Sequence, residues 1–243
     1  MKQMISTMTK NYKSTAIIIT AAGSSTRMGG QKKELIKLAA GGTVLSAAVN
    51  VFSVLPDHDV QIKKIIITVP AQTSDENVYL EALRVVPPVL FDKIQLVRGG
   101  KTRQESVFNA LLALETVNPE IVLIHDGARP FVSEELILSL VSELNSVDAA
   151  APGIVPVDTI KLIDNSSYIK EHLLRKNLVC IQTPQLFIYK KILEAHKKAS
   201  HDNKEYTDDT EIFENYCGKV KVIHGDENNI KITYPADLEK LNV

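Results

Sequence analysis

Five runs of apolar residues, separated by segments of helical periodicity, restrict the fold of this chain more than any other feature. The runs cover residues 16–22, 65–69, 94–97, 121–125 and 220–224. Short runs without polar alternation are typical of strands that are buried on both faces. Helices are predicted between them near residues 43–54, 76–84, 103–115 and 133–144. Alternating strands and helices favour right-handed crossovers and an α/β fold, with a mostly parallel sheet and helices on both faces.

The chain length fits one domain better than two. Of its 243 residues, the first 14 are polar and basic, and we interpret residues 1–14 as a flexible leader before a single domain at residues 15–243. No run of about 18 apolar residues occurs, so no membrane span is expected. The net charge of −1 argues against a nucleic-acid or membrane surface. Cys180 and Cys217 lack metal or redox spacing, which favours free thiols and a cytoplasmic location.

One segment breaks the strand and helix pattern. Residues 157–181 alternate apolar and polar side chains at 159–163 and resume after a polar gap at 178–181. This pattern predicts a two-stranded arm with one exposed face. Because an isolated hairpin is at best marginally stable in water, we expect this β-arm to pack on a second subunit.

The first candidate for phosphate binding is the loop at residues 21–30, directly after the first apolar run. Ligands of open α/β sheets bind beyond the carboxyl ends of strands. The small residues Ala21, Ala22 and Gly23 let backbone N–H groups approach anionic oxygens, and Arg27 adds a fork of charged donors. The loop matches neither the P-loop nor the dinucleotide-binding fingerprint. An ordinary glycine-rich turn is the alternative interpretation.

An acid follows the fourth apolar run. Asp126 is placed to hold Mg²⁺ between phosphate oxygens, because Mg²⁺ prefers one or two carboxylates plus substrate oxygens. A turn or helix-capping aspartate is the structural alternative. The preceding His125 is expected to pack within the strand. Either Lys32 or Lys33 can reach phosphates as a point charge, although exposed lysine pairs are more common.

Three further segments are candidates for the same edge of the sheet. Residues 99–106 combine two glycines with Ser106, which suits contact with a base or phosphate or else an ordinary glycine turn. Residues 207–209 read first as a helix cap. Lys231 alternates with two isoleucines, a pattern that usually directs a lysine to solvent.

Taken together, these segments resemble the 2-C-methyl-D-erythritol 4-phosphate cytidylyltransferases of the non-mevalonate isoprenoid pathway. The matching segments are residues 21–28, Lys33 or Lys32, and residues 99–107, 125–130, 183–185 and 229–238. They keep the order and spacing of the family over nearly the whole chain after the leader. Ser25 departs from the pattern, because the family usually has a second glycine there. The stretch before the lysine is also shorter, and Lys33 gives the better alignment.

The resemblance implies a Rossmann-like fold with a β-arm that embraces a second subunit, and a set of site residues. Nucleotide-binding residues would be Ala21, Ala22, Gly23, Arg27, Lys33, Gly100 and Ser106. Asp126 would hold Mg²⁺ or another divalent cation. Residues around methylerythritol phosphate would be Arg129, Thr159, Arg175, Thr183 and Lys231. Arg27, Lys33 and Lys231 would be the catalytic cations.

The implied reaction needs no general base. A phosphate monoester with a second pKa near 6 is largely ionised at pH 7, so the acceptor phosphate can attack the α-phosphorus of CTP directly. Two alternatives remain: a ribitol 5-phosphate cytidylyltransferase, and a nucleotide-binding module that binds CTP without releasing pyrophosphate. An NAD-dependent oxidoreductase is excluded, because it would need a G-x-G-x-x-G loop and an acid about twenty residues later.

Overall fold

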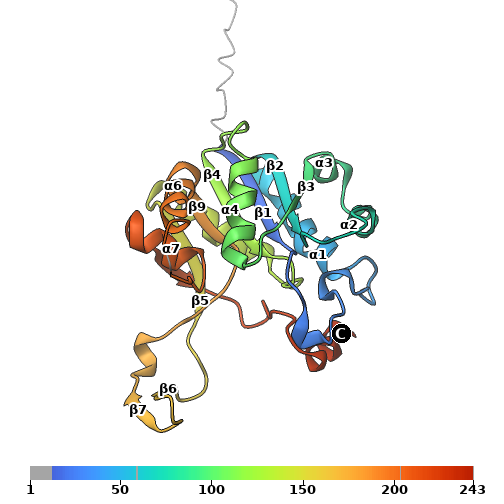
Figure 1. Cartoon of the computed structure of the whole chain (residues 1–243). Helices are drawn as coiled ribbons and strands as arrows, with labels where there is room; N and C mark the ends of the chain where they lie inside the picture. The colour runs from blue at the N-terminus through green and yellow to red at the C-terminus, as the bar shows by residue number, and fades with distance from the viewer. Residues whose placement is uncertain (1–12, 59, 203, 243) are drawn as a thin grey trace, which may run out of the picture.

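The computed structural model describes residues 13–58, 60–202 and 204–242 (Figure 1). Most of the leader predicted at residues 1–14 lies outside these described residues. Lys13 and Ser14, its last two residues, already belong to the first strand.

A central sheet organises the chain. Among the described residues, eight strands form it in the order β10-β5-β9-β4-β1-β2-β3, with β8 added beside β5. Its strands are β1 (Lys13–Thr20), β2 (Val60–Val69), β3 (Ile94–Arg98), β4 (Ile121–Asp126), β5 (Ala149–Ile154), β8 (Cys180–Ile181), β9 (Gln185–Ile188) and β10 (Lys221–His224). The β1–β2, β1–β4, β2–β3 and β5–β10 pairs are parallel, whereas β8 and β9 pair antiparallel with their neighbours. The predicted mostly parallel sheet is confirmed.

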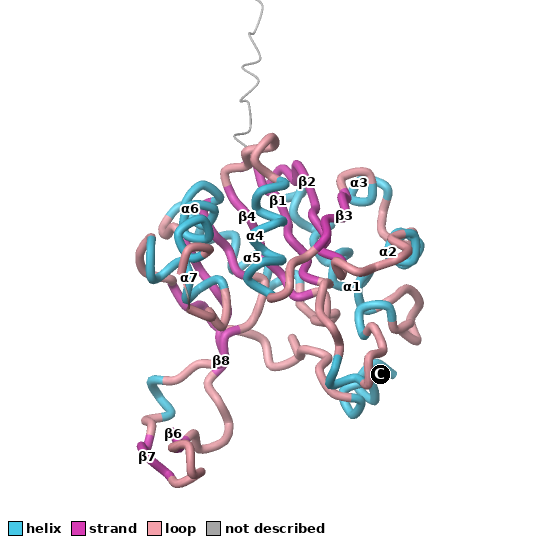
Figure 2. The backbone as a smooth tube through the Cα atoms, viewed as in Figure 1, coloured by secondary structure: helices cyan, strands magenta, loops and turns pink. Residues whose placement is uncertain are grey.

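Helices lie on both faces of this sheet (Figures 1 and 2). The α-helices are α1 (Val44–Asn50), α2 (Asn77–Leu83), α3 (Pro88–Phe91), α4 (Arg103–Ala113), α5 (Glu134–Ser142), α6 (Tyr189–Ala199) and α7 (Asp209–Tyr216). Short 3-10 helices are η1 (Thr26–Met28), η2 (Lys33–Leu35), η3 (Val51–His58), η4 (Glu143–Asn145), η5 (Arg175–Asn177) and η6 (Pro235–Asn242). None of the helices in the described part of the chain has the length and apolar character needed to cross a membrane.

The apolar run in β1 feeds two cores, one on each face. Ile17 and Ile19 pack in a cluster with Leu45 of α1, whereas Ile18 packs in a second cluster with Val107 of α4. All five side chains are fully buried. Burial of each large apolar side chain contributes about 1.5–3 kcal/mol, so the uninterrupted apolar run is what makes a central strand stable here.

The β-arm differs in detail from the prediction. Its two strands are β6 (Lys161–Ile163) and β7 (Ile169–His172), which pair antiparallel. The second strand was expected at 178–181, but β8 in that stretch pairs with β5 of the central sheet. Every residue of β7 is exposed, so none of its side chains has to be apolar. For this reason its sequence resembles a polar loop between two strands. The arm extends away from the sheet (Figures 1 and 2).

Candidate active site

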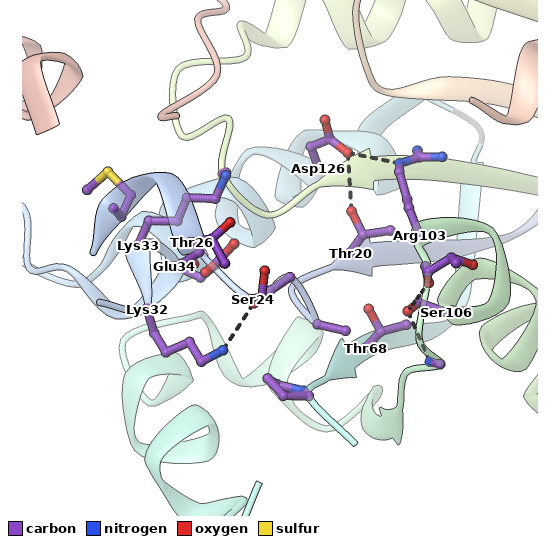
Figure 3. A pocket seen from close by; sticks show the side chains of 18 of the residues that line it. Thr20, Ser24, Thr26, Lys32, Lys33, Glu34, Thr68, Arg103, Ser106 and Asp126 are labelled. Carbon is purple, nitrogen blue, oxygen red and sulfur yellow. Dashed lines mark hydrogen bonds and ion pairs between the residues drawn. The ribbon is translucent and has the colours of Figure 1, made fainter. Parts of the chain in front are cut away.

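A cavity of about 1010 Å³ opens where β1, β2, β3 and β4 end (Figure 3). Small-ligand pockets usually measure about 300–1,000 Å³, so this one has room for a nucleotide and a second small molecule. The segments that line it are distant in sequence. They include residues 22–28, 32–34, 70–72, 100–103 and 105–106, together with Thr20, Thr68, Asp126, Ala128, Lys231 and Thr233.

The first loop, which follows the carboxyl end of β1, contains the short helix η1. Ser25, which replaces the usual glycine, has a φ of 54° and precedes η1. Gly29 and Gly30 have φ values of 64° and 87°. Only glycine adopts this left-handed region without steric cost, so Ser25 is a strained position in the loop. The exposed Arg27 guanidinium lies 5.5 Å from the centre of the Tyr234 ring.

Both candidate lysines line the cavity. The Nζ of Lys33 donates a hydrogen bond to the Ile232 carbonyl at 2.9 Å, and the Nζ of Lys32 donates to the Gly23 carbonyl at 3.1 Å. Burial lowers the pKa of Lys33, and the nearby Lys231 and Arg27 lower it further. A ligand with several negative charges would relieve this repulsion between neighbouring cations. Lys33 therefore forms a cationic cluster with Arg27 and Lys231, whereas the hydrogen bond of Lys32 to Gly23 stabilises the first loop.

Asp126, at the end of β4, is the centre of this cluster. Its Oδ2 lies 2.7 Å from the Nζ of Lys231, and its Oδ1 lies 3.6 Å from the Nε of Arg103. Thr20 donates a hydrogen bond to the same Oδ1 at 3.2 Å (Figure 3). Burial alone would raise the pKa of Asp126, but these cations outweigh it and hold the pKa well below its usual range. The carboxylate therefore stays ionised. It holds two cations near each other, Lys231 from the loop that follows β10 and Arg103 from α4.

Polar residues behind Asp126 fix its backbone. The N–H of Asp126 donates to the Oγ1 of Thr183 at 3.0 Å, and that hydroxyl also lies 3.1 Å from Nδ1 of His125. Burial lowers the pKa of His125 to about 4, so the ring is neutral near pH 7. His125 is fully buried, as expected for a packed strand residue. Asn229 completes this layer by donating to the Thr183 carbonyl at 2.9 Å.

The loop between β3 and α4 (residues 99–102), here called the third loop, approaches the first loop because its glycines leave space. A Cβ added to Gly99 would lie 2.5 Å from the Cβ of Ala22, and one on Gly100 would lie 2.2 Å from the Cβ of Glu105. The Gly100 N–H donates to the Oγ of Ser106 at 3.1 Å. This contact holds the two residues predicted for the cytosine end next to each other on the cavity wall.

The predicted site residues divide into three groups. Those that line the cavity are Ala22, Gly23, Arg27, Lys33, Gly100, Ser106, Asp126 and Lys231. Those that support its wall without lining it are Ala21, which follows β1 and donates to the Thr68 carbonyl, Thr183, and Arg129, whose Nε lies 3.8 Å from Asp126. Thr159 and Arg175 are exposed in the β-arm, where Arg175 donates to the Val157 carbonyl at 2.6 Å. A single chain thus does not bring these last two to the cavity.

Arg103 and Glu34 are two charged residues that line the cavity and were not among the predicted site residues. Arg103 is the first residue of α4 and belongs to the matching segment at residues 99–107, where only Gly100 and Ser106 were assigned a role. Glu34 is 3% exposed, and its Oε2 has no hydrogen-bond partner. Burial raises the pKa of Glu34. The sequence favours an exposed pair of lysines at 32 and 33, and no local signal distinguishes a buried glutamate directly after them.

The residues present fit a magnesium ion that is completed by ligand phosphates. No cluster of three or more His, Cys, Asp or Glu side chains suited to a metal occurs in the described residues. Mg²⁺ commonly uses one or two carboxylates with substrate phosphates instead of an all-protein cage. Asp126 meets that requirement, because its Oδ1 faces the cavity with only the longer contacts to Thr20 and Arg103.

Comparisons with known proteins agree on one family. The family model IspD, 2-C-methyl-D-erythritol 4-phosphate cytidylyltransferase, matches residues 15–242. A protein of that name from Clostridium beijerinckii is 43% identical over 222 residues, which cover 91% of this chain and 93% of the relative. Another from Clostridium kluyveri is 40% identical over 227 residues, which cover 93% and 94% of the two chains.

Solved structures give the same result. The crystal structure of 4-diphosphocytidyl-2C-methyl-D-erythritol synthase from Anaerococcus prevotii is similar with a TM-score of 0.80, 34% identity and 95% coverage of both chains. The structure of the bifunctional IspDF from Campylobacter jejuni is similar with a TM-score of 0.73 and 30% identity. That match covers 94% of this chain and 54% of the Campylobacter chain.

Proposed function

Because this chain belongs to the 2-C-methyl-D-erythritol 4-phosphate cytidylyltransferase family, we propose that it transfers CMP from CTP to 2-C-methyl-D-erythritol 4-phosphate. The products would be 4-diphosphocytidyl-2-C-methylerythritol and pyrophosphate, within non-mevalonate isoprenoid biosynthesis. The observation that carries the proposal is the cavity itself. Cationic groups from four distant segments surround Asp126 at the carboxyl edge of one sheet.

The positions of the cations suggest how the reactants bind. We assign the triphosphate to the first loop with Arg27 and Lys33, and the cytosine end to Gly100 and Ser106 on the opposite wall. Lys231 then lies where the two reactants meet, since it contacts Asp126 between these walls. Two polyanions repel each other, so several positive groups at one place are the main requirement of this reaction.

The chemical step is an in-line displacement at phosphorus. An oxygen of the acceptor phosphate forms a bond to the α-phosphorus of CTP, and the bond from that phosphorus to the β-phosphate oxygen breaks as pyrophosphate leaves. No proton has to be removed, because the acceptor phosphate is already largely ionised at pH 7. The chain supplies orientation and charge neutralisation, with Lys231 and Lys33 as donors to oxygens on which negative charge grows.

Asp126 would hold Mg²⁺ or another divalent cation when both phosphates are present. When bound, the cation would supply neutralisation of negative charge on the phosphates. Lys231 stays 2.7 Å from Oδ2 of the same carboxylate, where its ammonium group adds positive charge for the reactants.

The β-arm supports a homodimer in which the arm reaches a second subunit. Several large apolar side chains on and around the arm are exposed, among them Val157 at 81% and Tyr168 at 73%. Exposed apolar surface of this kind marks an interaction site. In the dimer that we propose, Thr159 and Arg175 of the arm would complete the methylerythritol phosphate site with Arg129, Thr183 and Lys231.

We further propose a cytoplasmic location. Both cysteines are free thiols, Cys180 being exposed and Cys217 partly buried. Unpaired thiols are usual in a reducing compartment. No nucleic-acid partner is proposed, since the chain carries a net charge of −1.

A pyrophosphate-release assay tests the proposed function. We expect release from CTP that requires 2-C-methyl-D-erythritol 4-phosphate and a divalent cation, with lower kcat/KM for UTP or for ribitol 5-phosphate. Preference for ribitol 5-phosphate would move the chain to that alternative activity. CTP binding without pyrophosphate release would contradict catalysis altogether.

A further inference from the structure

Asp209 is a buried acid that lies outside the set of residues lining the cavity. The sequence suggested that residues 207–209 cap a helix, and the structure assigns that role to Asp208 alone. Its Oδ1 accepts a hydrogen bond from the Glu211 N–H at 3.0 Å at the start of α7. Asp209 is the first residue of α7 and is 0% exposed. Helix capping therefore does not account for Asp209.

Each oxygen of Asp209 has one partner. Oδ2 lies 2.7 Å from an Nη of Arg103, and Oδ1 lies 3.1 Å from Nε2 of His196 on α6. An ionised carboxylate only accepts hydrogen bonds, so Nε2 of His196 carries the proton. The His196 ring stacks on Phe108 of α4, with ring centres 6.1 Å apart. Three helices thus fix the position of this carboxylate.

Asp209 remains charged despite its burial. Burial acts to raise the pKa of Asp209. The neighbouring Arg103 and His196 lower this pKa by more than burial raises it, so it lies below the usual value for an aspartate. A buried ion pair of this type is a poor source of stability, because desolvation of both charges offsets much of their attraction. Holding one guanidinium in a fixed orientation is a role that this arrangement performs well.

The other side of the Arg103 guanidinium group faces the cavity. Its Nε lies 3.6 Å from Oδ1 of Asp126, and its side chain is 29% exposed. Figure 3 places Arg103 between Asp126 and Ser106, on the wall to which we assign the cytosine end of CTP. Three successive ion pairs alternate in charge, from Asp209 to Arg103, from Arg103 to Asp126, and from Asp126 to Lys231.

We propose that Asp209 is a positioning residue, which holds Arg103 so that its free guanidinium edge contacts the phosphate of CTP nearest the ribose. This inference rests on the proposed function, because it specifies a contact within the same nucleotide site. Arg103 presents planar N–H donors that suit a phosphate, and half of that fork is already occupied by Asp209. Rotation of the guanidinium away from the cavity would break the 2.7 Å ion pair. His196 acts one step further back, by orienting Asp209.

The alternative role for Asp209 is structural, as a tie between α4 and α7. Both roles predict that a variant loses stability, so stability alone does not separate them. Only the positioning role predicts that the loss of CTP affinity depends on Arg103.

The test is a double-mutant cycle on CTP affinity and on kcat/KM with the full chain. Asp209→Asn keeps the shape of the side chain and removes its charge. We expect at least a tenfold weaker Kd for CTP and about a 10²-fold lower kcat/KM, as for other misplaced groups. In the Arg103→Ala background the same change should alter both values by less than twofold. Asp208→Asn is the matched control, because asparagine caps helices as well as aspartate, and its kinetics should equal those of the parent chain.

Several results would overturn the proposal. Equal effects of Asp209→Asn with and without Arg103 would leave only the structural role, as would unchanged CTP affinity in folded Asp209→Asn. If Asp209→Asn does not fold, Arg103→Gln and Arg103→Lys decide instead. We expect Lys to retain more CTP affinity than Gln, and full affinity in Arg103→Gln would refute the contact. Failure of the proposed function gives a different result, because the parent chain would then release no pyrophosphate. The double-mutant cycle could still be evaluated from the Kd values for CTP.

Discussion

Replacing Lys231 with alanine tests the cationic cluster most severely. The Nζ of Lys231 lies 2.7 Å from Asp126 and lines the cavity, so its removal takes away the cation nearest to the carboxylate. Two unit charges at about 4 Å interact by about 4 kcal/mol at the effective dielectric constant of a protein surface. Loss of one donor that acts on developing charge costs about 3–4 kcal/mol, or 10²–10³ in rate. We expect kcat to fall by at least that factor.

The fold should survive the same change. The Lys231 side chain is 37% exposed, so its ion pair with Asp126 stabilises the chain by only about 1 kcal/mol after solvent screening. Arg103 and Arg129 still lie within 4 Å of that carboxylate. A loss of about 1 kcal/mol lowers Tm by about 2–4 °C in a chain of this size.

Pyrophosphate release under saturating CTP and acceptor, together with calorimetry, measures both effects. Lys190→Ala is the matched control, because Lys190 is exposed on α6 and does not line the cavity. A kcat of Lys231→Ala within threefold of the control would refute the role of Lys231. A drop in Tm beyond about 10 °C would instead mean that Lys231 holds the fold together.

Three further predictions concern the framework of the site. Burial lowers the pKa of His125 to about 4, whereas an unfolded histidine titrates near 6.5, so the unfolded state binds more protons between these values. Stability should therefore fall by up to about 3 kcal/mol as the pH drops from about 6.5 to 4, and urea titrations of His125→Asn should show a flatter pH dependence. Asp208→Ala removes the cap of α7 and should cost about 1–2 kcal/mol in the free energy of unfolding; an unchanged urea midpoint would contradict the capping role. Gly99→Ala places a Cβ 2.5 Å from Ala22, so we expect about 1–3 kcal/mol of overpacking and a several-fold higher KM for CTP. Equal KM values would mean that the first and third loops need not lie so close.

The central sheet could be predicted because its strands carry an unambiguous signal. The apolar runs in β1, β2 and β4 are long enough to mark strands that are buried on both faces. Two strands, β5 and β9, were not predicted, each for a different reason. β5 contains Ala, Pro and Gly, which are weak strand formers, and the four residues of β9 run directly into α6. Tertiary packing determines both strands more than local sequence does.

The candidate site was predictable where it lies in loops after strands. The parallel sheet brings the carboxyl ends of β1, β3 and β4 together, so residues that follow them meet at one cavity. Lys231 illustrates the limit of a local pattern. Alternation with two isoleucines usually directs a lysine to solvent, yet the Nζ of Lys231 lies 2.7 Å from Asp126 on the cavity wall.

Arg103 and Asp209 show what sequence alone does not reveal. They are 106 residues apart, and nothing near Asp209 signals that an arginine from another helix is its partner. The arm residues Thr159 and Arg175 present the opposite difficulty. Their predicted role needs a second subunit, so it depends on an assembly that neither the sequence nor one chain describes.

Isotope labelling of the acceptor tests the central claim that its phosphate attacks CTP within this cavity. The chain is incubated with CTP and with 2-C-methyl-D-erythritol 4-phosphate that carries ¹⁸O in its phosphate, and the products are analysed by ³¹P NMR and mass spectrometry. We predict that every labelled oxygen stays in the diphosphate product, that one of them bridges its two phosphorus atoms, and that the pyrophosphate is unlabelled. Formation of CMP in place of that product, or labelled pyrophosphate, would contradict the account.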